Sequence, residues 1–321
     1  MLFRALLSPV ALVILVMAST STVSAQDAPQ PAGEPTLLIA DDSRAFSRPV
    51  WSPDGERIAF TTAGYEGLWT SRSSGDGIVQ ITDEPSAGFG FTWSTDGQEL
   101  LTRVTRTEGL SRSHAVKVFD VNTGEARELT EYRSRMPAVP QWTADGTAIV
   151  LPISDAVEVL EQQRPESGRS AMESSVYLGG ENGMELIRLY NGVPETRRLL
   201  EGLRVLNAVI SPDGSRVAFE VMGGDMYVMN QDGSAVTSLG VGYRASWSPD
   251  SQWIAFMRTE DNGKQITSSD LYAARADGGI IVPLTQTTHR LEMNPSWSPD
   301  GASIVFDDLT DGVIYVLPLT R

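Results

Sequence analysis

Few side chains in this sequence are suited to acid–base, nucleophilic or metal chemistry. The chain has only two histidines, His114 and His289, far apart in the sequence, and it has no cysteine. A zinc protease would show H-E-x-x-H and a serine hydrolase G-x-S-x-G, and neither pattern occurs. The nearest match to the second, residues 168–172 (GRSAM), lacks the final glycine. We therefore predict no catalytic residue, no metal ligand and no cofactor.

Aspartate is the residue that recurs at a fixed place, and carboxylates are the ligands that calcium prefers. Six copies occupy equivalent turn positions: Asp54, Asp96, Asp145, Asp213, Asp250 and Asp300. An aspartate in such a turn can accept hydrogen bonds from its own backbone, so we predict a structural role. A denser acidic run, Asp307, Asp308 and Asp311 beside Gly312, lacks the EF-hand spacing. We predict a solvated loop there, with calcium binding as the alternative.

The six aspartates belong to one motif, W-S-P-D-G followed by an apolar run. Its copies start at Trp51, Trp93, Trp142, Ile210, Trp247 and Trp297. Pro53 fixes φ at the second position of a type I turn, and Gly55 supplies the positive φ that follows. Ser251 replaces this glycine in the fifth copy, which predicts a strained turn. The motif therefore predicts a tight hairpin, in which the tryptophans and aspartates are structural.

Two more strand patterns follow each hairpin, as Leu68–Ser71 and Ile78–Ile81 do in the first copy. Four strands in a repeat of about 40–50 residues are typical of a propeller blade. Six copies predict an all-β fold: a six-bladed β-propeller of four-stranded antiparallel blades. The last repeat is one strand short, and the strand pattern Thr36–Ala40 precedes the first motif. We predict that this N-terminal strand completes the last blade, which closes the ring and removes exposed edges.

The predicted domain order is a signal peptide (1–25), a flexible lead (26–35) and the propeller (36–321). The third repeat, from Trp142 to Ile210, is longer than the others, and we predict an insertion near Ser154–Glu181. Only Val157–Gln163 shows any helical pattern.

The repeat resembles that of the C-terminal propeller of TolB, the periplasmic component of the Tol–Pal system. That repeat has the form WSPDGxxIAF, then IYVM, then GxxxxLT, and here it is carried by Trp247–Phe256, Met226–Asn230, Ile314–Leu317 and Glu128–Thr130. The resemblance covers the predicted propeller and not the α/β domain that precedes it in TolB. It implies a propeller that binds protein partners. Similar repeats also occur in sugar-processing lyases and in prolyl-oligopeptidase-type peptidases.

One face of the predicted propeller is the better candidate for binding. It carries the loops between second and third strands and those that lead into each first strand, whereas the W-S-P-D-G turns lie opposite. The long segments Arg106–Ser113 and Thr259–Ser269, and the insertion, belong to this face. Loops on a rigid scaffold are where binding usually resides.

Cationic side chains collect on the same face. Arg48 and Arg244 each lie three residues before a motif tryptophan, and Asn294 holds the equivalent place in the last repeat. Neighbouring loops supply Arg133, Arg135, Arg204 and Arg290. We predict a basic channel mouth that binds a carboxylate or an acidic peptide through bidentate arginine contacts. The alternative is that these arginines pair with nearby acids such as Asp41, Asp42 and Glu292.

The first 25 residues are typical of a secretory signal, with Arg4 in the basic start, the apolar run Ala11–Ala18 and the small residues Val23-Ser24-Ala25. An uncleaved membrane anchor is the alternative. Cleavage would leave 24 basic and 41 acidic residues, a net charge of −17, because Arg4 is the only charge removed from the total of 25 and 41. Such a charge disfavours nucleic acid and anionic membranes as partners.

We therefore predict an exported monomer, periplasmic or extracellular, that is not inserted in the membrane after cleavage. Its predicted function is a non-catalytic binding scaffold for a protein or peptide partner. The alternatives are an enzyme acting on a carbohydrate or peptide at the channel mouth, and an accessory subunit whose partner supplies the chemistry.

Overall fold

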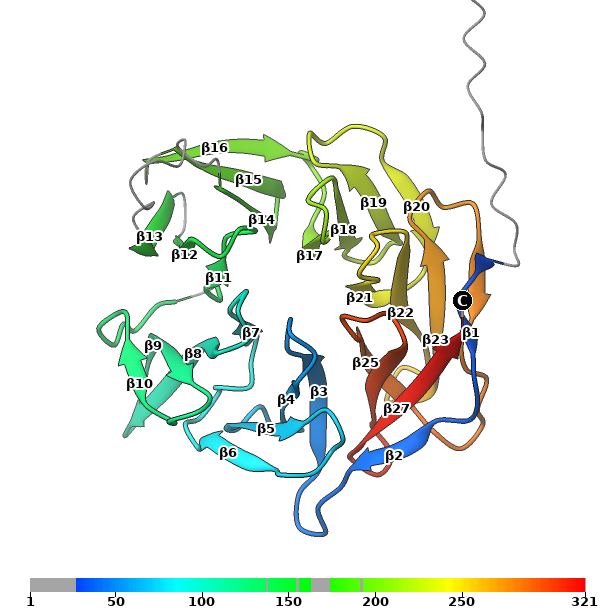
Figure 1. Cartoon of the computed structure of the whole chain (residues 1–321). Coiled ribbons are helices and arrows are strands. Elements are labelled where there is room, and N and C mark those ends of the chain that lie inside the picture. The colour runs from blue at the N-terminus through cyan, green and yellow to red at the C-terminus, as the bar shows by residue number, and fades with distance from the viewer. Residues whose placement is uncertain (1–26, 137, 154–155, 163–173, 191–192, 321) are drawn as a thin grey trace, which may run out of the picture.

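The computed structural model describes residues 27–136, 138–153, 156–162, 174–190 and 193–320. The elements in this part are β-strands, and they form seven sheets arranged as blades around a ring (Figure 1). The all-β propeller architecture is therefore confirmed, but the predicted number of six blades is wrong. The predicted signal peptide lies outside the described residues.

Blades one, two, five and six each have four strands. Blade one is β3 (Phe46–Trp51), β4 (Arg57–Thr62), β5 (Leu68–Arg72) and β6 (Val79–Thr82). Blade two is β7 (Thr92–Trp93), β8 (Glu99–Glu108), β9 (Ser111–Asp120) and β10 (Ala126–Glu128). Blade five is β17 (Val205–Ile210), β18 (Arg216–Val221), β19 (Met226–Asn230) and β20 (Thr237–Gly240). Blade six is β21 (Tyr243–Trp247), β22 (Trp253–Asp261), β23 (Ile266–Arg275) and β24 (Ile281–Pro283).

The long third repeat supplies two blades, which explains the wrong count. Blade three is β11 (Gln141–Trp142), β12 (Ala148–Ile153) and β13 (Ala156–Gln162), and blade four is β14 (Ser174–Gly180), β15 (Gly183–Tyr190) and β16 (Val193–Leu199). In the described residues both have three strands, not the predicted four. The predicted insertion near Ser154–Glu181 therefore includes both β13 and β14. The segment with a helical pattern, Val157–Gln163, falls largely on β13. Residues 163–173 lie outside the described part.

The hairpin between β14 and β15 occupies the place of a second-to-third-strand hairpin. The amide of Gly183 in this hairpin donates to the carbonyl of Leu203, just before β17, the first strand of blade five (2.6 Å). Between blades seven and one, the second-to-third-strand hairpin of blade seven makes the equivalent contact, in which the carbonyl of Gly312 accepts from the amide of Phe46 on the first strand β3 (2.6 Å). Blade four therefore has no W-S-P-D-G turn among its described strands. A count of motifs misses such a blade.

The ring is closed by the N-terminal strand, as predicted. Blade seven consists of β25 (Glu292–Trp297), β26 (Ser303–Asp308) and β27 (Val313–Thr320), and β2 (Thr36–Ile39) pairs with β27 (Thr36 opposite Val316). The short strand β1 (Gln30–Pro31), within the predicted lead, also pairs with β27. Ile39 is buried against blade one in a cluster with Phe46 and Phe60, so this strand packs as well as pairs.

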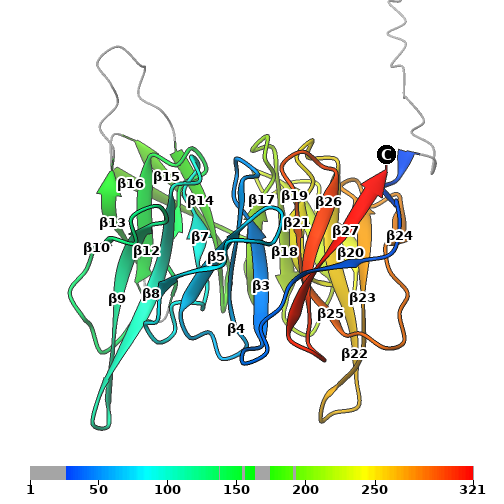
Figure 2. The ribbon, with the colours of Figure 1, turned by 60° about the horizontal axis from the view of Figure 1, so that its bottom comes forward.

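The hydrophobic core lies between neighbouring blades rather than at one centre. Each cluster joins strands of adjacent sheets, as Leu239 of β20 packs with Trp247 and Ile254 of blade six. Two hairpins, β8–β9 and β22–β23, extend far beyond the rest of the disc on one face (Figure 2).

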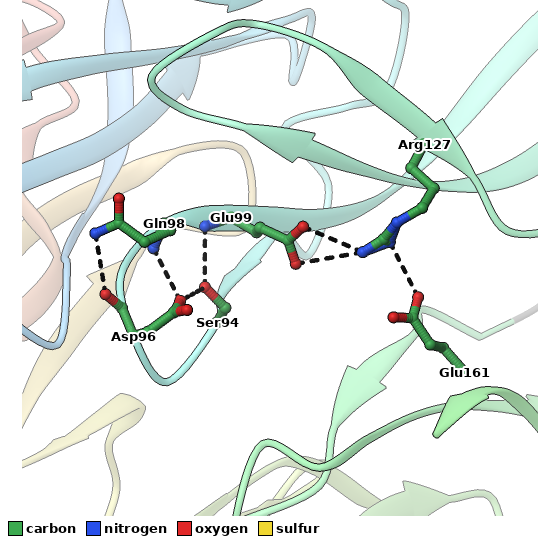
Figure 3. Close-up of polar contacts among 6 residues, drawn as sticks. All are labelled: Ser94, Asp96, Gln98, Glu99, Arg127 and Glu161. Atoms are coloured by element: carbon green, nitrogen blue, oxygen red, sulfur yellow. Dashed lines mark hydrogen bonds and ion pairs between the residues drawn. The ribbon is translucent and has the colours of Figure 1, made fainter. Parts of the chain in front are cut away.

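The motif turns have the predicted hydrogen bonds, which Figure 3 shows for blade two. Ser94 Oγ donates to Asp96 Oδ1 (2.6 Å), the amide of Gln98 donates to the same oxygen (3.1 Å), and the amide of Glu99 donates to Ser94 Oγ (2.9 Å). All six motif aspartates accept from the hydroxyl two residues earlier. Ser251 has a φ of 59°, so the strained turn predicted there is present.

Candidate functional site

The position three residues before the motif tryptophan has a special backbone conformation. Arg48, Asn207, Arg244 and Asn294 occupy it, and all four have positive φ, between 47° and 61°. Each lies where the register of the first strand against the second shifts by a bulge. Such bulges re-aim side chains at the end of a sheet. Because the first strands surround the centre of the ring, these residues lie around the mouth of the channel (Figure 1).

A side chain from the preceding blade holds each of three bulges. The amide of Arg48 donates to Asp307 Oδ1 (3.0 Å), the amide of Arg244 to Glu220 Oε1 (2.8 Å), and the amide of Asn294 to the sulfur of Met257 (3.4 Å). Each of these partners is the tenth residue after the motif position of its own repeat. The mouth is therefore built by contacts between consecutive blades.

Arg48 and Arg244 place two cationic side chains at this mouth. They come from blades one and six, yet the charge of Arg244 helps to lower the pKa of Arg48. Burial is the larger cause, and together these effects bring the pKa of Arg48 to about 10. The guanidinium of Arg48 lies over the ring of Tyr65, 5.4 Å from its centroid. Within the described part of the chain, neither arginine side chain forms an ion pair.

Two of the three acids proposed as alternative partners are engaged elsewhere. Asp41 pairs with Arg44 (3.3 Å), and Glu292 accepts hydrogen bonds from the hydroxyls of Thr285 and Thr287. Arg48 and Arg244 therefore keep their charge available to a ligand.

Asp307 lies directly behind the arginines. Its side chain is 2% exposed, and Oδ1 also accepts from Asn294 Nδ2 (3.0 Å). Burial raises the pKa of this carboxyl to about 7, against the opposing effect of its hydrogen bonds and of Arg48. Asp308 is equally buried and accepts from the amide of Leu291 (3.0 Å). The prediction of a solvated loop is wrong for these two residues, because both are buried on β26.

Sequence reasoning missed a further arginine at the mouth. Arg103 of β8 is at the tenth position of its repeat, and it donates to the carbonyl of Met136 (2.7 Å), just before blade three. Its guanidinium lies 5.3 Å from the centroid of Phe89, which in turn contacts Tyr65 edge-on (5.6 Å). Burial lowers the pKa of Arg103. Its shared position with Asp307 and Glu220 is the signal that could have found it.

Two of the other predicted arginines are in ion pairs with acids, as the alternative prediction stated. Arg133 forms a bidentate ion pair with Glu158 (2.5 and 2.8 Å), and Arg204 pairs with Glu181 (2.6 Å). Arg290 lies over the ring of Tyr315 (4.5 Å), and Arg135 is exposed. The core of the site thus consists of Arg48, Arg244, Asn294, Arg103, Asp307 and Glu220, which we call the mouth cluster.

The two long hairpins flank the mouth cluster. Arg48 lies near the second-to-third-strand end of blade one, because Phe46 pairs with Thr62 at the end of β4. The tips of β8–β9 and β22–β23 are hairpins of the same kind, so they lie on the same face. The segments Arg106–Ser113 and Thr259–Ser269 are therefore paired strands and tight tips rather than loops. The tip residue Leu110 is fully exposed.

The histidines do not take part in the mouth cluster. His114 Nδ1 is hydrogen-bonded to Thr105 Oγ1 (2.9 Å) on the β8–β9 hairpin, and burial lowers its pKa. His289 is exposed. Within the described ranges, no group of three or more acidic or histidine side chains could hold a metal ion, and no helix is long and apolar enough to cross a bilayer.

Comparison with solved structures identifies similar folds at low sequence identity. A putative TolB from Agrobacterium tumefaciens is 19% identical, with a TM-score of 0.52 over 87% of this chain and 91% of that chain. The β-propeller domain of Cps50 (Swd1) from Myceliophteria thermophila is 10% identical, with a TM-score of 0.56 over 89% and 100%. TolB from Acinetobacter baumannii is 16% identical, with a TM-score of 0.49 over 87% and 64%.

The structural neighbours include TolB-like propellers. No protein-family profile and no curated protein matches the chain. At these identities the similarity establishes the fold, and the function has to be argued from the mouth cluster.

Proposed function

We propose that this protein is an exported, non-catalytic binding scaffold that presents its hairpin-bearing face to a protein or peptide partner. In this proposal the mouth cluster receives a carboxylate of the partner, from an acidic side chain or a chain end. Arg48 and Arg244 bind the carboxylate, and Asn294 between their blades donates a further hydrogen bond. The resemblance of the repeat to that of TolB, the periplasmic component of the Tol–Pal system, supports a location in the periplasm or outside the cell.

The observation that carries the proposal is that, among the described residues of this acidic protein, Arg48 and Arg244 form no ion pair. The sequence has 41 acidic and 25 basic residues, so most arginines can find an acid nearby. Arg48 is instead partly buried beside a second arginine, which costs enough to lower its pKa. An anion between the two guanidinium groups would offset this repulsion, and charge-assisted hydrogen bonds are the strong ones. The nearby rings of Tyr65 and Phe89 add apolar contact area for a peptide.

Binding of a labelled acidic peptide tests this function. We would measure the fluorescence anisotropy of a fluorescein-labelled hexaglutamate with the full chain, with hexaserine and hexalysine as controls. Saturable binding of the acidic peptide is expected, and it should weaken at least about tenfold in Arg48→Ala/Arg244→Ala, since a hydrogen bond to a charged group contributes about 1.5–3 kcal/mol.

The matched control removes the same charge from the opposite face. Arg72 and Arg275 lie at the third-strand ends beside the motif turns, and both are in ion pairs, with Asp76 and Asp277. Arg72→Ala/Arg275→Ala should therefore bind the peptide as the unmodified chain does. Equal weakening in the two double variants would mean that net charge, not the mouth cluster, determines binding, and it would overturn the proposal.

A further inference from the structure

The outer edge of blade three differs from that of the complete blades. Blades one, two, five and six each place a fourth strand outside the third, whereas β13 pairs only with β12 among the described residues. The third strands of the complete blades have mostly buried cores. In β13, by contrast, all five residues from Val157 to Glu161 are partly exposed. Among the described residues, blade three thus lacks the cover that a fourth strand gives elsewhere.

The backbone of β13 offers hydrogen-bonding groups at this edge. Pro152 of β12 lies opposite Val157, and proline has no N–H to donate. This pair must therefore be one of the non-hydrogen-bonded pairs of the antiparallel ladder, whose groups point away from each other. Because the two kinds of pair alternate, Val159, opposite Val150, has the same orientation. Val157 and Val159 both direct N–H and C=O toward the missing fourth strand.

The fourth strands elsewhere show what blade three would need. In blades one, two, five, six and seven this strand is short, three or four residues long. An aliphatic side chain in or beside it enters the core between its own blade and the next: Ile81 for β6, Leu239 for β20, Leu284 for β24 and Ile39 for β2. The equivalent core in blade three contains Val176 and Leu178 of blade four. Val157 and Val159 pack against its edge.

The fold already accepts an outer strand from a distant segment. Blade seven receives β2 from the other end of the sequence, and β2 both pairs with β27 and buries Ile39. An added segment therefore needs only an extended backbone and an aliphatic side chain at the right position.

Ion pairs hold β13 in place without a fourth strand. Arg127 of β10 bridges Glu99 (3.1 Å) and Glu161 (3.0 Å), which ties β13 to blade two (Figure 3). The bidentate pair of Arg133 with Glu158 adds a second attachment. An edge that is already ordered loses less conformational entropy when a segment binds.

We propose that β13 is a second interaction surface, at which a short extended segment of a partner protein adds as the fourth strand of blade three. The segment pairs with the backbone of Val157 and Val159, and its aliphatic side chain packs beside Val176. This is the strand-addition mode of peptide recognition, in which main-chain hydrogen bonds supply affinity and one side-chain position supplies specificity. The surface is independent of the mouth cluster, so either proposal can fail without the other.

A peptide that is a natural fourth strand provides the probe. We would use a synthetic peptide with the sequence of residues 34–41 (EPTLLIAD), which contains β2 and Ile39, and measure amide hydrogen exchange in the full chain. With about 1 mM peptide, the range in which short unstructured segments bind, the Val157 and Val159 amides should exchange at least about threefold more slowly. A peptide with Ile39→Asp should have no effect, because its side chain cannot enter an apolar core.

Two variants separate the backbone donor from the side chain. Val157→Pro removes an N–H that does not bond to β12, so blade three should stay folded while peptide protection at Val159 is lost. Val157→Ala keeps the N–H and should keep the protection. Protection that is unchanged in Val157→Pro, or absent in the unmodified chain, would overturn the proposal. Val157 and Val159 amides that are already protected without peptide would also overturn the proposal, because the chain would then fill this edge itself. Protection that grows with protein concentration would identify a second copy as the occupant instead.

Discussion

Replacing Asp307 by asparagine should make the protein more stable at high pH. Oδ1 of Asp307 accepts both of its hydrogen bonds, from the amide of Arg48 and from Asn294 Nδ2. An asparagine Oδ1 can accept the same two bonds, and its Nδ2 takes the place of the other carboxyl oxygen. The variant is therefore a close mimic of the protonated aspartic acid, with nearly the same shape and no charge.

The sign follows from the direction of the pKa shift. The native pKa is about 7, above the ordinary value of 3.8, so between these values the native state binds more protons than the unfolded state. Stability must then fall as pH rises from about 4 to about 7. A pKa shift of this size corresponds to about 4 kcal/mol. This is the upper limit of the difference in the free energy of unfolding between Asp307→Asn and the unmodified chain at high pH. Below about pH 4 the difference should vanish, since both states are then protonated.

Urea unfolding of both proteins at about pH 4 and about pH 8 measures the difference. Glu292, whose pKa burial also raises to about 7, is present in both proteins and cancels in the comparison. Asp300→Asn is the matched control, because hydrogen bonds from Ser298 and Ala302 lower the pKa of Asp300. Removing the charge of Asp300 should lower the free energy of unfolding more at pH 8 than at pH 4. A free-energy difference for Asp307→Asn that does not change with pH would refute the reasoning, and would mean that the pKa of Asp307 is not raised in the native state.

Two further predictions concern ring closure and the close contacts between blades. Ile39→Ala should lower the free energy of unfolding by about 2–4 kcal/mol, because Ile39 is 1% exposed and belongs to the closing strand. Leu37→Ala is the control: Leu37 lies on the same strand but is 58% exposed, so this variant should change the free energy of unfolding little in the same urea titration. Gly214→Ala should cost about 1 kcal/mol, because φ is 73° and the added Cβ meets open space. Gly312→Ala should destabilise the protein clearly more in thermal unfolding, because its φ is 68° and the added Cβ would lie 2.3 Å from the Cβ of Ala45. Equal losses of stability at the two glycines would contradict this close contact.

The sequence was sufficient to predict the features that depend on local geometry. The turn around Asp96 needs only a hydroxyl, an aspartate and a glycine in order, and the structure has these bonds. The closing strand at Thr36–Ile39 could also be predicted, because a ring must pair its last edge. Blade four could not be counted in this way. Its strands carry apolar residues such as Val176 and Leu186, but its hairpins have no recurrent turn sequence among the described residues.

The candidate site was predicted in part, for a related reason. The position of Arg48 and Arg244 relative to the tryptophan was visible in the repeat, and both have the bulge conformation that sets this position apart. The sequence predicts a solvated loop at Asp307, because its neighbours in sequence are acidic and near a glycine. Its burial is caused by blade one, which is separated from it by most of the chain, and no local pattern records that contact.

The same contacts between blades explain how the mouth cluster can hold like charges close together. The backbone of Arg48 is fixed by Asp307, and that of Arg244 by Glu220. Within the described residues, neither guanidinium group forms an ion pair. The acids thus position the arginines through their amides rather than neutralising them through their side chains. A binding site gains affinity when its charged groups are held in place before the ligand arrives. In this propeller the packing that stabilises neighbouring blades also supplies that order, so the stability of the ring and the readiness of the mouth to bind an anion depend on the same residues.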